Sequence, residues 1–204
     1  MDSIMEPMEG ATPLDPDEME GLRFKHIVNR RQLDELEQKN IEEGLLWLGR
    51  IRRRGFDPLS EAFARELHRQ LFGQVWHWAG SFRRTEKNIG VDPIQISVLL
   101  RDSLENARCW VEYQTYPPLE AAARLHHRLV YIHLFPNGNG RHARILADCY
   151  LEHYFGLPAI DWAAGQWLQN NSPRRLEYIA ALRAADAGDF SPLLRFVGVD
   201  VPQA

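Results

Sequence analysis

Apolar residues recur every three or four positions through most of this 204-residue chain, which is the spacing of one face of an α-helix. Short segments rich in Pro and Gly interrupt the pattern, and alternating strand-like stretches are almost absent. The sequence therefore predicts a mainly α fold. We expect helices from Asn29 to about Leu48, from after Pro58 to before Gly73, from Ile96 to Trp110, from Leu119 to Ile132, from about Arg144 to Phe155, near Asp161 to Leu168, from Arg174 to Ala187 and from Ser191 to Phe196.

Two segments depart from this helical pattern. The first residues carry many Asp, Glu and Pro without a sustained period, and residues 82–96 place bulky residues around a polar middle. We interpret the second segment as an irregular hairpin or flap. The predicted organisation is an extended acidic arm over residues 1–28, an N-terminal helix over residues 29–55 and one domain over residues 56–204.

The charge balance limits the partners that the chain can have. A formal net charge of -4 argues against a general nucleic-acid or membrane-surface binder, which usually carries a basic excess. The sequence has no charged-then-apolar leader and no apolar run long enough to span a bilayer. We therefore expect a cytoplasmic protein whose basic groups are confined to a local site, with neither a nucleic acid nor a membrane as its partner.

The stretch HLFPNGNGRHAR, residues 133–144, separates two apolar helices. Pro136 lacks an N–H and disfavours helical angles in the residue before it, so the preceding helix should end close to His133. The glycines that follow let the backbone approach a ligand closely. Asn139 is suited to cap the next helix, whose N-terminus would present free N–H groups. This loop predicts an anion site.

Two arginines stand in the first turn of that next helix. Arg141 and Arg144 are three residues apart, so their side chains leave toward the same place. Each opposes the helix dipole at a local cost of roughly 0.3 to 1 kcal/mol, which a bound anion would offset, and a guanidinium fork suits phosphate oxygens. His133 is the nearby side chain whose ordinary pKa suits proton abstraction near neutral pH. A simple turn between helices does not require a histidine, a glycine loop and paired arginines together. This combination of residues predicts a nucleotide site.

The chain resembles the Fic/Doc family. Every fixed position but one of the family signature H-x-F-x-[D/E]-G-N-G-R-x-x-R is matched, by His133, Phe135, Gly138, Asn139, Gly140, Arg141 and Arg144. The resemblance extends to VWHWAGSFRR and to YIAALRAADAGDFSPLL, and it covers roughly residues 58–197. The opening TPLDPDEMEGL resembles the small bacterial Fic proteins called mobile mystery protein B.

The resemblance implies a Fic-type helical bundle with a small β-hairpin flap. It also implies an adenylyltransferase (AMPylator), in which a Tyr, Ser or Thr hydroxyl of a target protein attacks the α-phosphate of ATP. By the same resemblance, His133 is the general base, Gly138, Asn139 and Gly140 line the anion hole, Arg141 contacts the α- and β-phosphates, and Arg144 contacts the γ-phosphate. Phe135 would anchor the loop in the core. The flap, with Arg84, Ile89 and Gly90, would dock an extended target segment by strand addition.

Asn137 is the one departure from the signature. The family carries Asp or Glu there, and that carboxylate holds Mg²⁺ against the nucleotide. An amide oxygen can coordinate a hard cation but lacks the negative charge that makes carboxylates preferred ligands. We therefore expect ATP binding with weakened Mg²⁺ binding and with weakened or altered catalysis. The alternatives are a Doc-like phosphotransferase, use of another nucleotide, or a non-catalytic regulator in a toxin-antitoxin-like pair with a regulatory partner protein. Homo-oligomerisation is left open.

A regulatory glutamate is the last feature that the resemblance suggests. Many Fic proteins carry an inhibitory helix with the pattern [S/T]-x-x-x-E-[G/N], whose Glu pairs with the second motif arginine. KNIEEG, residues 39–44, matches that pattern in part. We expect Glu43 to pair with Arg144, and Glu42 is the alternative if the register shifts.

Overall fold

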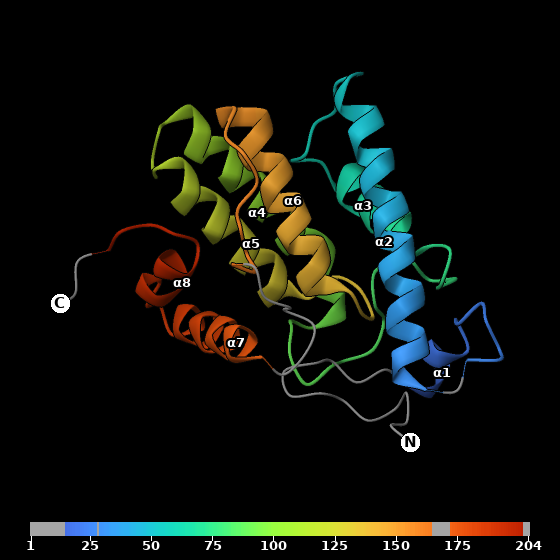
Figure 1. Cartoon of the computed structure of the whole chain (residues 1–204). Helices are drawn as coiled ribbons and strands as arrows, with labels where there is room; N and C mark the ends of the chain where they lie inside the picture. Colours follow the sequence, from blue (N-terminus) through green and yellow to red (C-terminus); the bar gives the residue numbers. More distant parts are fainter. Residues whose placement is uncertain (1–14, 28, 165–171, 202–204) are drawn as a thin grey trace.

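A computed structural model describes residues 15–27, 29–164 and 172–201 of the chain. Within this part the chain is mainly helical, as predicted (Figure 1). The elements are α1 (Pro16–Met19), α2 (Arg30–Arg52), α3 (Glu61–Phe72), the 3₁₀ helix η1 (Pro93–Gln95), α4 (Ile96–Glu112), α5 (Pro118–Ile132), α6 (Asn139–Phe155), α7 (Pro173–Asp186) and α8 (Ser191–Phe196). None of these helices combines the length and the apolar content that crossing a membrane requires.

Local signals in the sequence set several helix ends. The side chain of Asn29 accepts a hydrogen bond from the Gln32 N–H, 3.0 Å away, so the predicted cap of α2 is confirmed. Ser60 caps α3 in the same way, through the Phe63 N–H. The prolines before α5 provide its start, since proline at the first helical position loses no hydrogen bond.

The core forms where α5 packs between α4 and α6, and a second layer forms where α2 packs along α3 (Figure 1). α5 and α6 contribute side chains with 1% exposure or less, among them Leu125, Leu129, Leu146 and Tyr150. Asn40 fixes α2 against the end of α3, because its amide donates to the Gln70 carbonyl and accepts from the Gln74 N–H. α2 therefore lies close enough to the site to contribute side chains to it.

Three predicted features differ in the structure. The helix expected from about Arg144 begins at Asn139, and Asn139 does not cap it, because its side chain bonds to the Phe135 backbone instead. The helix expected near Asp161 is absent from residues 161–164, while residues 165–171 lie outside the described part. Much of the acidic arm also lies outside it, but residues 16–19 form α1 rather than extended chain.

The hairpin expected over residues 82–96 is not formed. Residues 82–92, called the flap below, contain no strand, and the segment continues through η1 into α4. Buried Arg83 explains this, because its guanidinium bonds to the carbonyls of Thr85, Val91 and His133. The Arg83 and Val91 N–H groups also donate to the Leu134 and Ile132 carbonyls, so the flap bonds to the end of α5 rather than across itself.

Candidate active site

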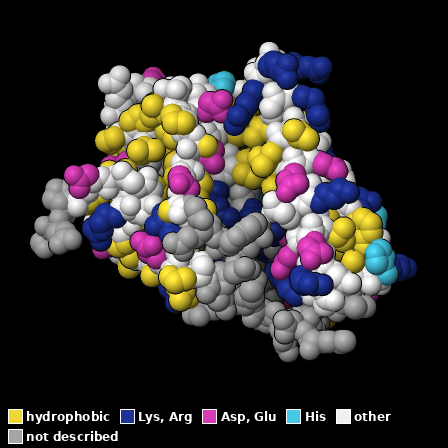
Figure 2. Space-filling model, in the orientation of Figure 1, with side chains coloured by type: hydrophobic (Ala, Val, Ile, Leu, Met, Phe, Trp, Pro, Cys, Tyr) yellow, Lys and Arg dark blue, Asp and Glu magenta, His cyan; other side chains and the backbone are white. Residues whose placement is uncertain are grey.

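A cavity of about 380 Å³ lies where the first turns of α2 and α6, the end of α5, the flap and α7 converge. Figure 2 shows the surface hollowed between α6 and α2, with dark blue Lys or Arg side chains in the hollow. Most of the predicted site residues line this cavity: Ile89, Gly90, His133, Asn137, Gly138, Asn139, Gly140, Arg141 and Arg144. Arg84 and Glu43 are not among the described residues that line it.

His133 stands at the end of α5, in the left-handed conformation with φ 58° and ψ 67°. Its side chain is 4% exposed, and burial lowers its pKa to about 4, with a further contribution from the positive charges of Arg83 and Lys87. The imidazole is therefore neutral at physiological pH. A neutral imidazole has a lone pair that can accept a proton.

The flap approaches His133 through a glycine. Gly90 has φ +102°, and a Cβ added to it would lie 2.6 Å from the Cβ of His133. The Arg83 Nε donates to the His133 carbonyl at 2.6 Å, and the Val91 N–H bonds to the Ile132 carbonyl. Arg83 thus joins the flap to the residue expected to be the base. No local sequence pattern around Arg83 indicates this role.

The loop between α5 and α6 is held from both sides. The Asn139 side chain accepts from the Phe135 N–H at 2.9 Å and donates to the Phe135 carbonyl at 2.7 Å. His68 accepts from the Gly80 N–H at Nδ1, so its Nε2–H donates to the Asn137 carbonyl at 3.0 Å. The ring of His68 also stacks on Phe135, with centres 3.7 Å apart. Phe135 is buried, as expected for an anchor.

This support fixes the N-terminus of α6 at the cavity wall. Gly138 has φ +77°, and a Cβ there would lie 2.7 Å from the ring of Phe72, so glycine is required. The His142 N–H makes the first intrahelical bond, to the Gly138 carbonyl. The N–H groups of Asn139, Gly140 and Arg141 precede that bond and point out of the helix end. The arrangement suits an anion.

The two motif arginines have different neighbours. Arg141 forms an ion pair with Glu37 of α2 at 2.7 Å, and its guanidinium lies 4.8 Å from the centre of the Phe72 ring. The guanidinium of Arg144 lies 5.5 Å from the centre of the Tyr178 ring on α7. α2 and α7 therefore supply the side chains against which the two motif arginines lie.

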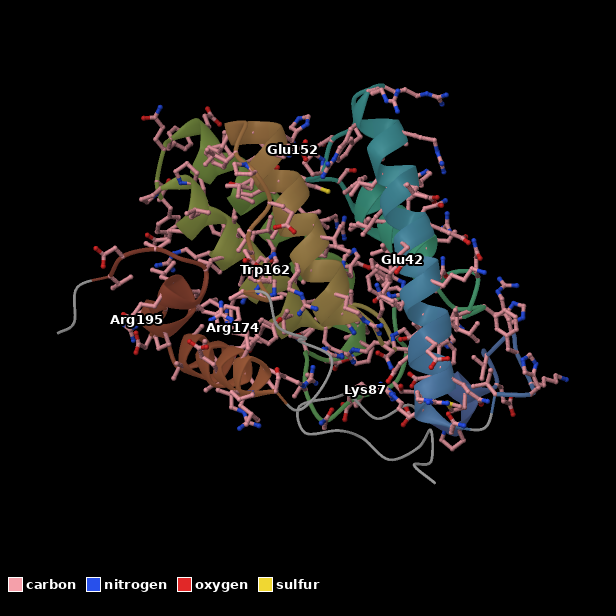
Figure 3. The ribbon with its side chains drawn as sticks, viewed as in Figure 1. Glu42, Lys87, Glu152, Trp162, Arg174 and Arg195 are labelled. Carbon is pink, nitrogen blue, oxygen red and sulfur yellow. The ribbon has the colours of Figure 1, made fainter. Side chains whose placement is uncertain are left out.

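The predicted pair of Glu43 with Arg144 is wrong. The Glu43 carboxylate accepts from Gln74 Nε2 instead. Glu42, labelled on α2 in Figure 3, is exposed and accepts from Gln38 of the same helix. The glutamate of α2 that reaches a motif arginine is Glu37, which the sequence analysis missed. Its carboxylate is buried and also accepts from the indole N–H of Trp76 at 2.6 Å.

The residues present do not fit a protein-held Mg²⁺. The Asn137 side-chain oxygen lies 2.5 Å from the Gly138 nitrogen, whose N–H it accepts. The two carboxylates that line the cavity are also engaged, Asp34 by Arg30 and Asp186 by His127. Among the described residues no three His, Cys, Asp or Glu side chains gather into a group that could hold a metal ion. Mg²⁺ usually needs at least one carboxylate besides substrate phosphates.

The flap is also tied to the N-terminal segment. Lys87, labelled in Figure 3, has a side chain that is 1% exposed and pairs with Asp15, 2.8 Å away, and with Glu18. The Thr85 hydroxyl donates to Glu18 as well. The beginning of the described chain thus holds the flap against the site.

Comparisons with known proteins agree with this geometry. Residues 58–151 match the model of the Fic/DOC family. The protein adenylyltransferase fic-1 of Caenorhabditis elegans is 31% identical over 149 residues, which is 69% of this chain and 27% of that protein. The chain thus spans about a quarter of that relative's length.

Solved structures show the same fold. Fic-1 of Caenorhabditis elegans aligns with a TM-score of 0.59 and 28% identity, over 78% of this chain and 46% of that chain. The BepC protein of Bartonella tribocorum aligns with a TM-score of 0.65 over 93% of this chain and 100% of that chain, and its 19% identity supports the fold alone. The family match over residues 58–151, with the motif around His133 in which Asn137 is the one departure, shows that this chain contains a Fic/DOC family domain.

Proposed function

We propose that the chain is a protein adenylyltransferase that transfers AMP from ATP to a hydroxyl side chain of a target protein. The observation that carries the proposal is the meeting of neutral, buried His133 with the α6 N-terminus and Arg144 in one cavity. The family relatives named as adenylyltransferases support it.

The chemistry requires positioning more than covalent catalysis. The target hydroxyl oxygen forms a bond to the α-phosphorus while the bond from that phosphorus to the oxygen bridging the β-phosphate breaks, and pyrophosphate leaves. His133 accepts the hydroxyl proton. The N–H groups at the start of α6 and the guanidiniums of Arg141 and Arg144 stabilise the negative charge on the phosphate oxygens.

The flap is the proposed docking site for the target. Arg84 is exposed and the Ile89 side chain is 44% exposed, so both are accessible to a target segment that lies along the flap. Gly90 keeps that segment close to His133, since any larger residue would push the flap away. The acceptor is thus expected to be a hydroxyl in an extended segment.

We further propose that α2 restrains the reaction, through Glu37 rather than Glu43. The Glu37 carboxylate occupies one side of the Arg141 guanidinium, which is the arginine expected to hold the α- and β-phosphates. An arginine that is already paired offers fewer donors to phosphate. The chain would therefore show low transfer until α2 shifts.

Incubation with ATP labelled at the α or the γ phosphate tests the activity. Label from the α position on protein, lost in His133→Ala, is the expected result. Label from the γ position would instead identify a Doc-like phosphotransferase. Asn137 favours the rival function, a regulator without transfer, and ATP binding without label from either position would support that rival.

A further inference from the structure

The cavity holds more positive charge than the Fic motif supplies. Among the residues that the structure describes, five arginines line it, Arg30, Arg141, Arg144, Arg175 and Arg183, against two aspartates. Two of the arginines pair with carboxylates of α2, Arg30 with Asp34 at 3.1 Å and Arg141 with Glu37 at 2.7 Å. Even when Glu37 is counted, arginines exceed carboxylates at a wall where the α6 dipole is also positive.

Arg175 of α7 is the arginine that extends this wall beyond the motif. Its side chain is half-buried, and its pKa is lowered, first by burial and then by the positive charges of Arg144, Arg141 and Arg30. Cations placed this close repel one another, and burial prevents water from screening the repulsion fully. A polyanion bound among them would remove that cost.

The position of α7 is set by packing that does not depend on a ligand. Tyr178, one turn after Arg175, is buried and bonds through its hydroxyl to His126 of α5 at 3.0 Å. Ser172 caps the helix through the Arg175 N–H. The guanidinium of Arg175 is therefore carried into the cavity by a rigid element, next to Arg144.

The positive charge of Arg175 could take the place of a metal ion that the side chains around Asn137 are not suited to hold. Asn137 stands where the family's metal-holding carboxylate would stand. The nearby carboxylates are engaged, Asp34 in an ion pair with Arg30 and Asp186 in a hydrogen bond with His127. A divalent cation normally neutralises phosphate charge and links neighbouring phosphates. A guanidinium can do both, because its planar fork donates two parallel hydrogen bonds to phosphate oxygens and its charge does not titrate near neutral pH.

We propose that Arg175, acting beside Arg144, supplies the countercharge that a metal ion would bring, so that this pocket binds a nucleoside triphosphate without a divalent cation. The inference rests on the proposed function for the identity of the ligand. It assigns to α7 a phosphate-binding residue outside the motif. It also explains how the site can work with Asn137, because the fixed positive charge of Arg175 takes the place of a metal ion held by a carboxylate at position 137.

Calorimetric titration of the full chain with ATP, in EDTA and in excess Mg²⁺, tests this. The wild type should bind with dissociation constants within about threefold of each other in the two buffers. Arg175→Met should weaken binding in EDTA by about tenfold or more, since both the positive charge and the hydrogen bonds of the guanidinium to phosphate are lost. Arg175→Lys, which keeps the charge without the fork, should lie between them. Inorganic tripolyphosphate in EDTA should compete with ATP for the wild type and much less for Arg175→Met.

Two further variants serve as controls. Arg195→Met removes an exposed arginine of α8, labelled in Figure 3, and should bind as the wild type does. Asn137→Asp adds a carboxylate beside the phosphates and should make binding depend on Mg²⁺. Circular dichroism of each variant checks that a loss of binding is not a loss of folding.

The results of these titrations either support or refute the proposed role of Arg175. Wild-type binding that disappears in EDTA, or a folded Arg175→Met and a folded Arg175→Lys that both bind in EDTA like the wild type, would overturn the inference. The proposed function is tested separately by α-phosphate transfer. If ATP binds without metal through Arg175 but no AMP is transferred, the role of Arg175 stands and the transferase function is refuted. If AMP is transferred but Arg175 does not affect binding, the transferase function stands and the role of Arg175 is refuted.

Discussion

The low pKa of His133 makes a prediction about stability that can be measured without any substrate. Burial lowers the pKa from 6.5 to about 4, so the unfolded chain takes up a proton as the pH falls below 6.5 while the folded chain does not until about pH 4. Folding is therefore disfavoured progressively between pH 6.5 and 4, and the His133 contribution is neutral above that window. For pKa values of 6.5 and 4, the loss between pH 7 and pH 5 is about 2 kcal/mol.

His133→Asn removes this titration while tolerating the left-handed backbone at that position. Between pH 7 and pH 5 the variant should lose about 2 kcal/mol less of its free energy of unfolding than the wild type does. Urea denaturation followed by circular dichroism at pH 7, 6 and 5 gives both values. Equal losses in the two proteins would refute the buried, neutral imidazole on which the proposed base depends.

His142 provides the matched control. Burial also lowers its pKa to about 4, but it lies behind the loop and bonds through Nε2 to the Ala64 carbonyl at 2.8 Å. His142→Gln keeps a donor for that carbonyl and should reduce the acid sensitivity by a similar amount, about 2 kcal/mol. It should keep α-phosphate transfer, which His133→Asn should lose. The pair separates the role of His133 in stability from its role in chemistry.

Three other substitutions test the contacts around the site. Glu37→Gln keeps an acceptor for Trp76 but removes the negative charge paired with Arg141. ATP should therefore bind more tightly in calorimetry, while the free energy of unfolding should fall by about 3 kcal/mol. Weaker ATP binding would contradict the restraint by α2. Gly90→Ala forces the flap away from His133 and should lower transfer at least tenfold and stability by about 1–3 kcal/mol, and unchanged transfer would mean that the flap position is unimportant. Lys87→Met leaves buried Glu18 without its cation and should speed amide hydrogen exchange across residues 83–92, whereas unchanged exchange would show that α1 does not hold the flap.

The helices and the motif could be predicted because their signals are local. Apolar spacing predicts a helix from neighbouring residues alone, and the motif around His133 gathers base, glycines and arginines within twelve consecutive residues. Apolar spacing starts α6 too late, at about Arg144, because Asn139 and Gly140 are weak helix formers. The motif, with Asn139 as a cap and Arg141 in the first turn, predicts a start close to the observed one. The Asn139 side chain stabilises the first turn indirectly, through the Phe135 backbone.

Glu37 could not be assigned in the same way, since its two partners lie 39 and 104 residues further along the chain. A charged residue on a helix usually faces water, and it is tertiary packing around α2 that buries this one. One signal was nevertheless present. Glu37 follows Leu33 by four positions and precedes Ile41 by four and Gly44 by seven, so it lies in the middle of the face predicted to be buried.

That the flap forms no hairpin could not be predicted, for a related reason. Its bulky residues favour strands, but Arg83 is buried at 3% exposure and takes carbonyls of both the flap and the end of α5. Whether an arginine lies inside or outside depends on acceptors that are about fifty residues away in the sequence. Local propensity contains no information about them.

The contacts of Glu37 also indicate how nucleotide binding and α2 are linked. A phosphate that takes the side of Arg141 facing Glu37 must displace the Glu37 carboxylate, which is 2% exposed and would keep only the indole N–H of Trp76 as its described partner. A buried carboxylate stripped of its cation costs about 3–5 kcal/mol, which is comparable to the gain from a phosphate contact. Moving α2 so that Glu37 reaches water avoids that cost. Binding of the triphosphate and displacement of the first turns of α2 are therefore expected to occur together, and whatever holds α2 in place weakens nucleotide affinity.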